Sequence, residues 1–383
     1  MNTQNPQRMQ TSANERHVFS LPPYHEPDWT LPSLKDAPDC RLEPAPGDGL
    51  APEGYHALSI FPEYFRVNGR WILPAQSRMD TVCVIDNTPG GETADIVEFR
   101  RLKKGDLVVC GRNEDASEGI FVWDRGFAQE DESQDLFAFR TGRSRETAFS
   151  RDYDELYSLM RYEKEHGGQI TFVSGMTLAR DVESRAALAS LIRSGYVNAL
   201  FCGSETAALD LACGIDLADR GQFAGRNPSE SEALAIWQAT NAAHTAGSVE
   251  QLISSGQVHD GFIKAAVETG IPVVIAGTIR DPWLLPGAYD DVYAAQDAMR
   301  DIVRGTTTII FAAAILFTIA TGNMTPSYCI QGDRIRPLYM YTVDLQEFAV
   351  NKLADRGTLT ARPIVTSAHD FVVNLDHALT ERP

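Results

Sequence analysis

The chain has 383 residues, enough for two or three domains with sizeable hydrophobic cores. Its 43% hydrophobic and 22% charged residues are typical of a globular protein and exclude a disordered or fibrous one. The 52 acidic side chains outnumber the 34 basic ones and give a formal charge of −18, which disfavours nucleic acid and anionic membranes as main partners.

Residues 1–47 are expected to form a Pro-rich arm, because PP, EP, LP and AP steps interrupt regular structure. Residues 48–150 contain short β-branched and aromatic runs separated by turn clusters such as NTPGG, which predicts a small β-rich domain followed by a linker. The six cysteines form no CxxC pair, and the N-terminus has no charged-then-apolar leader pattern. Both features favour a cytoplasmic protein.

Residues 151–383 are expected to form a Rossmann-like domain of the α/β class, a doubly wound parallel sheet. After a helical segment at 153–168, apolar runs alternate with amphipathic stretches, and such continuous apolarity suits strands covered on both faces. The uncharged stretch 306–323 is too short in its apolar part for a membrane crossing and is expected to be a buried strand leading into a helix. The six predicted strands are 170–175, 197–203, 271–277, 308–316, 337–345 and 362–367.

Glycine ends three of these runs, at Gly175, Gly203 and Gly277. In an open parallel sheet, ligands bind outside the carboxyl ends of the strands, where the strand order reverses. A glycine there lets a ligand approach the backbone, although a tight strand-to-helix turn explains each one separately. Three at one edge favour a ligand site, while the GxGxxG fingerprint of dinucleotide folds is absent from the sequence.

Asp344, at the end of the fifth run, is a candidate for accepting hydrogen bonds from the adenosine ribose of a dinucleotide. An acid at this position disfavours a 2′-phosphate and therefore predicts NAD rather than NADP. The alternative is that Asp344 caps the helix expected for LQEFAVNKLADRG, and both interpretations stay open.

Arg280 and Asp281 follow the third run and are the most suggestive pair for chemistry. An Arg can bind a substrate carboxylate through two hydrogen bonds, and a neighbouring Asp can bind an ammonium group or transfer a proton. The alternative is a surface ion pair. The sequence contains no HExxH, P-loop or GxSxG motif, so metal-dependent hydrolysis, phosphoryl transfer and serine hydrolysis lack support.

The sequence resembles the ornithine cyclodeaminase domain of archaeal enzymes, which is also the C-terminal region of cyanobacterial bifunctional arginine dihydrolases. The resemblance is carried by the stretch ATNAAHTAGSVEQLISSGQVHDGFIKAAVETGIPVVIAGTIRDPWLLPGAYDDVYAAQDAMRD, with FTIATGNMTPS and VNKLADRGT after it. The first subdomain of the family is matched by GLAPEGYHALSIFPEYFRVNGRWILPAQSRMDTVCVI and LKKGDLVVCGR. Together the matches extend from about Asp48 to Asp370.

The resemblance implies an enzyme that holds NAD and cyclises ornithine to proline with loss of ammonia, hydride leaving the α-carbon and later returning. The candidate catalytic residues are Asp281, Arg280 and Asp210, the last in a Leu209–Asp210 pair where the family has His-Asp. The candidate cofactor-binding residues are Gly175, Gly203, Ser204, Glu205, Asp281, Ala314, Ile315, Leu316, Phe317, Asp344, Ser367 and Ala368.

The sequence departs from the family pattern along the same rim. Ser204–Glu205 stands in place of Asn-Ala, and Phe317 and Arg180 stand where the family has His. The scaffold is therefore expected to be retained, while the substrate stays open.

Three functions follow as hypotheses. The first is a cyclodeaminase-like enzyme acting on a small, ornithine-like amino acid or amine. The second is an NAD-dependent imine reductase or amino-acid dehydrogenase that releases reduced cofactor. The third is a non-catalytic nucleotide-binding protein. In each case we expect a small-molecule partner, no metal, and a homo-oligomer, since dinucleotide proteins of this fold often associate.

Overall fold

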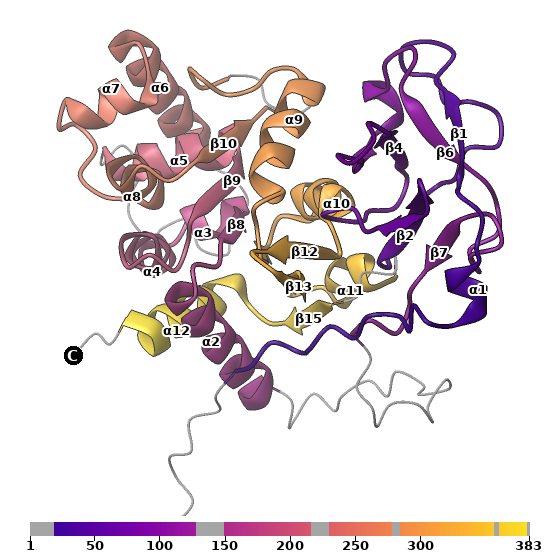
Figure 1. Cartoon of the computed structure of the whole chain (residues 1–383). Coiled ribbons are helices and arrows are strands. Elements are labelled where there is room, and N and C mark those ends of the chain that lie inside the picture. The colour runs from indigo at the N-terminus through magenta and orange to yellow at the C-terminus, as the bar shows by residue number, and fades with distance from the viewer. Residues whose placement is uncertain (1–18, 128–148, 216–229, 278–283, 356–359, 381–383) are drawn as a thin grey trace, which may run out of the picture.

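The computed structural model describes residues 19–127, 149–215, 230–277, 284–355 and 360–380 (Figure 1). Residues 19–127, here the first part, are rich in β-strands. Residues 149–380, here the second part, alternate strands with helices. Among the described residues, no helix is both long and apolar enough to cross a bilayer.

Two antiparallel sheets make up the first part, one in the order β1-β6-β4-β5 and the other in the order β3-β2-β7. β1 lies within the range expected to be an arm. Its Pro44 is compatible with a strand because β1 is at the edge of its sheet. The elements are α1 (Pro32–Lys35), β1 (Arg41–Pro44), β2 (Glu63–Val67), β3 (Arg70–Ile72), β4 (Val82–Asp86), β5 (Thr93–Val97), η1 (Phe99–Arg101), β6 (Leu107–Cys110) and β7 (Ile120–Val122).

The second part is built on a parallel sheet of six strands in the order β10-β9-β8-β11-β14-β15. Each strand overlaps one of the six apolar runs of the sequence, so the predicted Rossmann-like fold is confirmed, although the run 308–316 is a strand only to Ala312 and its last two residues begin α10. A two-stranded antiparallel hairpin, β12–β13, is inserted before the fifth strand. The strands are β8 (Ile170–Ser174), β9 (Ala199–Gly203), β10 (Val273–Ala276), β11 (Thr308–Ala312), β12 (Tyr328–Gln331), β13 (Arg334–Pro337), β14 (Tyr339–Asp344) and β15 (Ala361–Val365).

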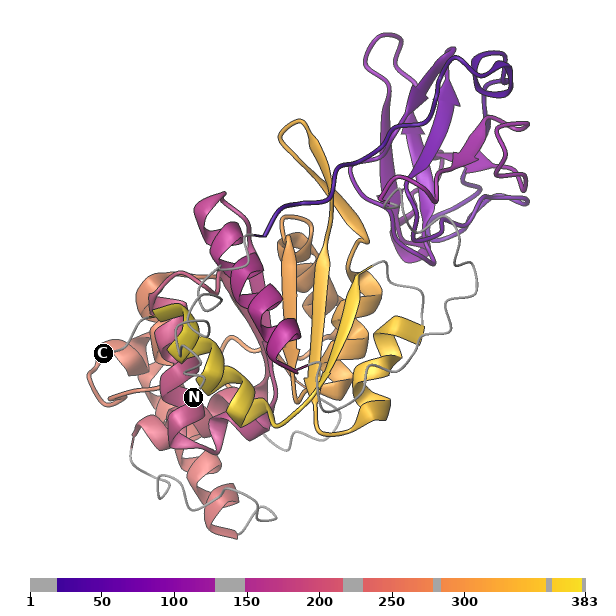
Figure 2. The ribbon, with the colours of Figure 1, turned by 90° about the horizontal axis from the view of Figure 1, so that it is seen from below.

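Helices lie on both faces of this sheet (Figure 2). The stretch 306–323 forms β11 and most of α10, as expected for a buried strand leading into a helix. The helices are α2 (Phe149–Glu165), α3 (Met176–Ala179), α4 (Val182–Arg193), α5 (Ser204–Gly214), α6 (Glu230–Ala246), α7 (Val249–Ser254), α8 (Phe262–Thr269), α9 (Val292–Val303), α10 (Ile315–Met324), α11 (Glu347–Asp355) and α12 (Ala368–Thr380).

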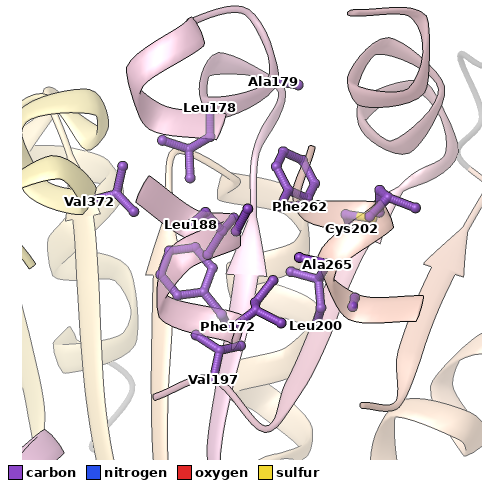
Figure 3. Close-up of a cluster of buried hydrophobic side chains, with 14 of the residues drawn as sticks. Phe172, Leu178, Ala179, Leu188, Val197, Leu200, Cys202, Phe262, Ala265 and Val372 are labelled. Carbon is purple, nitrogen blue, oxygen red and sulfur yellow. The ribbon is translucent and has the colours of Figure 1, made fainter. Parts of the chain in front are cut away.

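Successive side chains of each central strand enter different hydrophobic clusters. Phe172 packs in the larger cluster with residues of α4, α8 and α12 (Figure 3), whereas its neighbour Val173 packs in a second cluster with residues of α9 and α11. Since successive strand residues point to opposite faces, both faces must be apolar when both are covered. This explains why the strand sequences are continuously rather than alternately hydrophobic.

The first part contacts the second at the amino-terminal edge of the parallel sheet. Arg78 donates to the carbonyl oxygen of Met324 at 3.3 Å, and Tyr328 donates to that of Pro74 at 2.9 Å. Glu98 forms ion pairs with Arg78 at 2.9 Å and with Arg300. Arg300 lies in the last turn of α9, which precedes the start of β11. Met324 ends α10, which precedes the β12–β13 hairpin and the start of β14. The carboxyl ends of the strands therefore face away from the first part.

Candidate functional site

The strand order reverses between β8 and β11. From β8 the chain adds β9 and β10 on one side, then crosses over and adds β11, β14 and β15 on the other. This is the arrangement in which a nucleotide binds in the crevice outside the carboxyl ends of the two central strands. Ser174 and Ala312, paired in register at these ends, mark the switch point.

The backbone at the switch point is tightly packed. The amide of Gly175 donates to the carbonyl oxygen of Ala312 at 2.8 Å, and a Cβ at Gly175 would lie 1.8 Å from the oxygen of Ala313. A Cβ at Gly277 would similarly lie 2.9 Å from the Leu284 side chain. Close approach of the protein's own backbone is therefore sufficient to explain Gly175, which is the tight-turn alternative left open by the sequence, and its role beside a cofactor stays a prediction.

Ala313 itself has a φ of 51°, in the left-handed region that non-glycine residues rarely adopt. Its amide donates to the carbonyl oxygen of Val343 at 3.0 Å, which ties the turn after β11 to β14. Strained backbone of this kind persists where neighbouring structure fixes it, and it is concentrated at ligand sites.

Two carboxylates flank the switch point, one on each side. Glu205 is in the first turn of α5, directly after β9, and Asp344 ends β14; both side chains are partly exposed. Because β9 adjoins β8 and β14 adjoins β11, the two acids are each one strand away from the crevice. Carboxylates at such strand ends accept hydrogen bonds from ribose hydroxyls in dinucleotide folds.

Asp344 does not cap α11 directly. Its Oδ1 accepts a hydrogen bond of 2.9 Å from the amide of Gln346, whereas the carbonyl of Gln346 accepts from the first turn of the helix. Asp344 therefore forms an Asx turn just before α11. The role of a ribose acceptor remains compatible with this geometry.

Gly203 and Phe317 are brought together across the ends of the central strands. A Cβ at Gly203 would lie 3.4 Å from the Phe317 ring, so the first turn of α10 reaches toward the end of β9. Ser204 is fully buried, and its hydroxyl accepts a hydrogen bond of 3.1 Å from the amide of Leu285. Ser204 thus connects α5 to the segment that follows β10.

The remaining candidates differ in how far their side chains are exposed. Ile315 is 37% and Leu316 69% exposed, and both begin α10 beside partly buried Ala314. Ser367 and Ala368 start α12 after the edge strand β15, and the Ala368 side chain belongs to the hydrophobic core. Arg280 and Asp281 lie outside the described residues.

Asp210 lies in the interior, on α5. It is 1% exposed and pairs with the guanidinium of Arg185 at 2.7 Å, while its other oxygen accepts from the amide of Ile263 at 2.9 Å. Burial alone would lower the pKa of Arg185, but Asp210 and then Asp260 outweigh it and raise that pKa. These contacts hold α4, α5 and the start of α8 together, so the Asp210 carboxylate would have to leave them to reach a substrate.

Two polar clusters on the same rim lie outside the candidate set, although the sequence marked Arg180 as a departure from the family pattern there. Arg180, after α3, donates to both oxygens of buried Glu232 at 3.1 and 2.9 Å. His369 Nδ1 lies 2.7 Å from Asp181 and 2.8 Å from the hydroxyl of Ser184. The second cluster had a local signal, because Asp181 and Ser184 have the spacing of a helix N-cap.

Asp181 is held as a carboxylate. Burial would raise its pKa, but hydrogen bonds from Ser184 and the neighbouring His369 lower it overall. The described residues contain no group of three His, Cys, Asp or Glu side chains arranged to bind a metal ion. Among the described side chains, the rim therefore offers carboxylates, an imidazole, the paired guanidinium of Arg180 and apolar surface.

Two family profiles match the chain. Residues 154–375 match the family described as arginine dihydrolase ArgZ-like, C-terminal, Rossmann fold, and residues 62–147 match the first region of the same C-terminal segment. The chain is 30% identical to an ornithine cyclodeaminase of Methanocaldococcus jannaschii, over 94% of this chain and 82% of that protein.

Solved structures resemble the chain over nine-tenths of its length. A conserved LOR/SDH protein of Methanococcus maripaludis has a TM-score of 0.76 and 29% identity, covering 90% of this chain and 99% of the other. AgrE, a bifunctional arginine dihydrolase/ornithine cyclodeaminase of Nostoc, was solved as a ternary complex with ornithine and NAD+. It has a TM-score of 0.54 and 27% identity, covering 90% of this chain and 46% of AgrE.

Proposed function

The chain belongs to the ArgZ-like C-terminal family, and from that premise we propose that it is an NAD-dependent cyclodeaminase acting on an ornithine-like amino acid. An enzyme of the cyclodeaminase type that uses NAD is what its relatives indicate. The substrate, the reaction steps and the roles of individual residues are our proposal.

The main support for the proposal is that a carboxylate lies on each side of the switch point, Glu205 after β9 and Asp344 at the end of β14. The two halves of a Rossmann sheet each receive one nucleotide of a dinucleotide. We therefore assign Glu205, beside β9, to the ribose of one nucleotide and Asp344, beside β14, to the ribose of the other. Two carboxylates fit a cofactor with free ribose hydroxyls and disfavour an added 2′-phosphate, which supports NAD.

The remaining residues would shape the cofactor site. The strained turn at Ala313 presents the backbone of Ala314 and Ile315 at the crevice, and exposed Leu316 offers apolar surface for a flat ring. Phe317, whose ring lies beside Gly203, would bound the cofactor site at the strand ends, and Ser204, Ser367 and Ala368 would lie at its margins. NAD, when bound, would accept a hydride from the α-carbon of the substrate and return it later.

The substrate side of the proposal rests on Arg280 and Asp281, which follow β10 along the chain and lie outside the described residues. Arg280 would bind the α-carboxylate through two hydrogen bonds, and Asp281 would bind an ammonium group or take up a proton from it. Asp210 is the third candidate of the catalytic set. In the proposed site it acts through the packing of α5 and α8, as a positioning residue.

The test is native mass spectrometry of freshly purified protein, followed by a panel of amino acids scored for ammonia release. We expect a bound dinucleotide of the mass of NAD and ammonia release with ornithine or a close analogue, with no net gain in absorbance of the reduced cofactor. Ammonia together with stoichiometric NADH would instead identify a dehydrogenase. Bound NAD with no turnover across the panel would reject catalysis on amino acids.

A further inference from the structure

We propose that a hollow between the first part of the chain and the β12–β13 hairpin binds a small organic cation carrying a guanidinium or alkylammonium group. The hollow has a volume of about 530 Å³ and is lined by Trp29, Tyr64 and Trp71 on one side and by the hairpin on the other. Small-molecule pockets typically measure about 300 to 1,000 Å³. The proposal does not depend on the function proposed above, because the hairpin precedes β14 and lies at the opposite edge of the sheet from the switch point.

The aromatic side chains are held in place before any ligand arrives. Trp29 stacks on Trp71, with ring centroids 5.8 Å apart and an angle of 27°, and meets Tyr64 edge-on at 4.8 Å. Trp71 donates its indole proton to the carbonyl oxygen of Leu34 at 3.0 Å, and the hydroxyls of Tyr64 and Tyr24 share a hydrogen bond of 2.8 Å. Rings fixed in this way lose little conformational entropy when a ligand binds.

The charge around the hollow favours a cation. Glu26 and Asp333 are exposed carboxylates that line it from opposite sides, one from the N-terminal segment and one from the hairpin turn. Arg70, the one cation among the described residues that line the hollow, forms an ion pair of 3.0 Å with Glu92. Burial and the charge of Glu26 raise the pKa of Tyr64 to about 12 against the lowering effect of the Tyr24 hydrogen bond, so this ring stays neutral at physiological pH.

Aromatic rings and carboxylates together select for an organic cation. The negative faces of Trp and Tyr attract guanidinium and ammonium groups, and the attraction grows when water is excluded. Ile330 and Ile335 of the hairpin add apolar surface for the carbon chain of the ligand. A metal ion would lack the ligands it needs here, and an anion would meet Glu26 and Asp333.

The experiment is a titration followed by NMR of the tryptophan indole signals, with n-butylguanidinium as the probe and neutral n-butylurea as its isosteric control. The chain has five tryptophans, so the signals of Trp29 and Trp71 can be separated from the other three. We expect saturable shifts of these two signals with n-butylguanidinium, and at least tenfold weaker binding of n-butylurea.

Variants locate the site. Glu26→Gln and Asp333→Asn are exposed changes that leave the fold intact, and each is expected to weaken binding about three- to tenfold, whereas Glu250→Gln on α7 leaves it unchanged. Trp71→Ala should abolish binding while the signal of Trp237, on α6, stays in place. Equal binding of n-butylurea, unchanged affinity in both acid variants, or shifts that follow protein concentration instead of ligand would each overturn the proposal; the last would show that a second copy covers the hollow.

Discussion

The carboxylates of Asp344 and Glu205 occupy equivalent places on the two sides of the switch point, and each can be neutralised without changing its shape. Asp344→Asn keeps an oxygen that can accept from the Gln346 amide, yet it is expected to weaken NAD binding by about 1 to 3 kcal/mol, because a ribose hydroxyl loses a charged acceptor. Glu205→Gln should have an effect of similar size. Titration calorimetry measures both.

The matched control is Asp301→Asn, an exposed acid on α9 near the opposite edge of the sheet. It should leave the dissociation constant unchanged. If Asp344→Asn and Glu205→Gln bind NAD as the wild type does, neither acid contacts a ribose.

Asp210 is a residue whose contacts predict an effect on stability. Asp210→Asn removes the charge that faces Arg185 at 2.7 Å in a fully buried setting, and breaking such a pair typically costs about 3 to 5 kcal/mol. Urea denaturation should show this loss in the free energy of unfolding. Asp260→Asn removes the more exposed partner of Arg185 and should cost less than about 1 kcal/mol. A large fall in kcat with unchanged stability would place Asp210 in contact with the substrate after all.

The candidate residues could be chosen from the sequence because each follows an apolar run that predicts a strand. This rule selected Glu205 and Asp344, which flank the switch point, and the residues that follow β11. It could not identify their partners. Ser204 bonds to Leu285 and His369 to Asp181 across long stretches of chain, and no local pattern encodes those contacts. The sequence also could not show why residue 175 must be a glycine, because the carbonyl group that leaves no room for a side chain belongs to Ala313, just after β11.

Among the elements, the two turns at the switch point are the most sensitive to added volume. Gly175→Ala would place a methyl group 1.8 Å from the Ala313 oxygen, so β8 and β11 must separate at their carboxyl ends. Overpacking of this kind costs about 1 to 3 kcal/mol or more. We expect a lower free energy of unfolding in urea together with weaker NAD binding.

Gly305→Ala serves as the comparison, because its nearest neighbour would be 3.8 Å away, an ordinary contact. Replacing Gly by Ala there should be neutral or slightly stabilising. Equal stabilities of the two variants would show that the turns have room to move apart.

The six strands could be predicted because both faces of the sheet are covered, which leaves uninterrupted apolar runs in the sequence. The β12–β13 hairpin was missed, although a signal was present: Gly332 and Asp333 form a two-residue loop between its strands, with Gly332 at a φ of 59°. The strands themselves are short and mix polar with apolar residues, so they lack the pattern that marks the larger sheet.

For the molecule as a whole, the position of the first part could not be derived from the sequence. Its β-rich character and its family resemblance were visible, but its contacts join residues such as Arg78 and Met324 that are remote along the chain. The sequence is equally compatible with the first part lying at the amino-terminal or at the carboxyl-terminal edge of the parallel sheet. The ion pairs of Glu98 fix it at the amino-terminal edge.

Buried phenols distributed over both parts predict how the whole molecule responds to alkali. Burial is the largest cause that raises the pKa of Tyr64, Tyr157 and Tyr339 to about 12. Since an unfolded tyrosine ionises near pH 10, the folded state holds these protons more tightly. The resulting stability is fully present below about pH 10 and is lost as the pH rises toward 12.

Free energies of unfolding in urea at a series of alkaline pH values test this expectation. Tyr157→Phe should make the decline less steep, whereas Tyr293→Phe, at a residue 55% exposed, should not. A decline of the same slope in all three proteins would assign the alkaline sensitivity to other groups, such as the buried thiols.

The hairpin and the fifth strand form one continuous piece of chain. Only Leu338 separates β13 from β14, and its amide donates to the carbonyl of Ser327 at 3.1 Å, so the hairpin base and the strand start are joined. β14 then runs between two parallel neighbours to Asp344. The same stretch of chain therefore lines the aromatic hollow at one edge of the sheet and ends with Asp344 at the other.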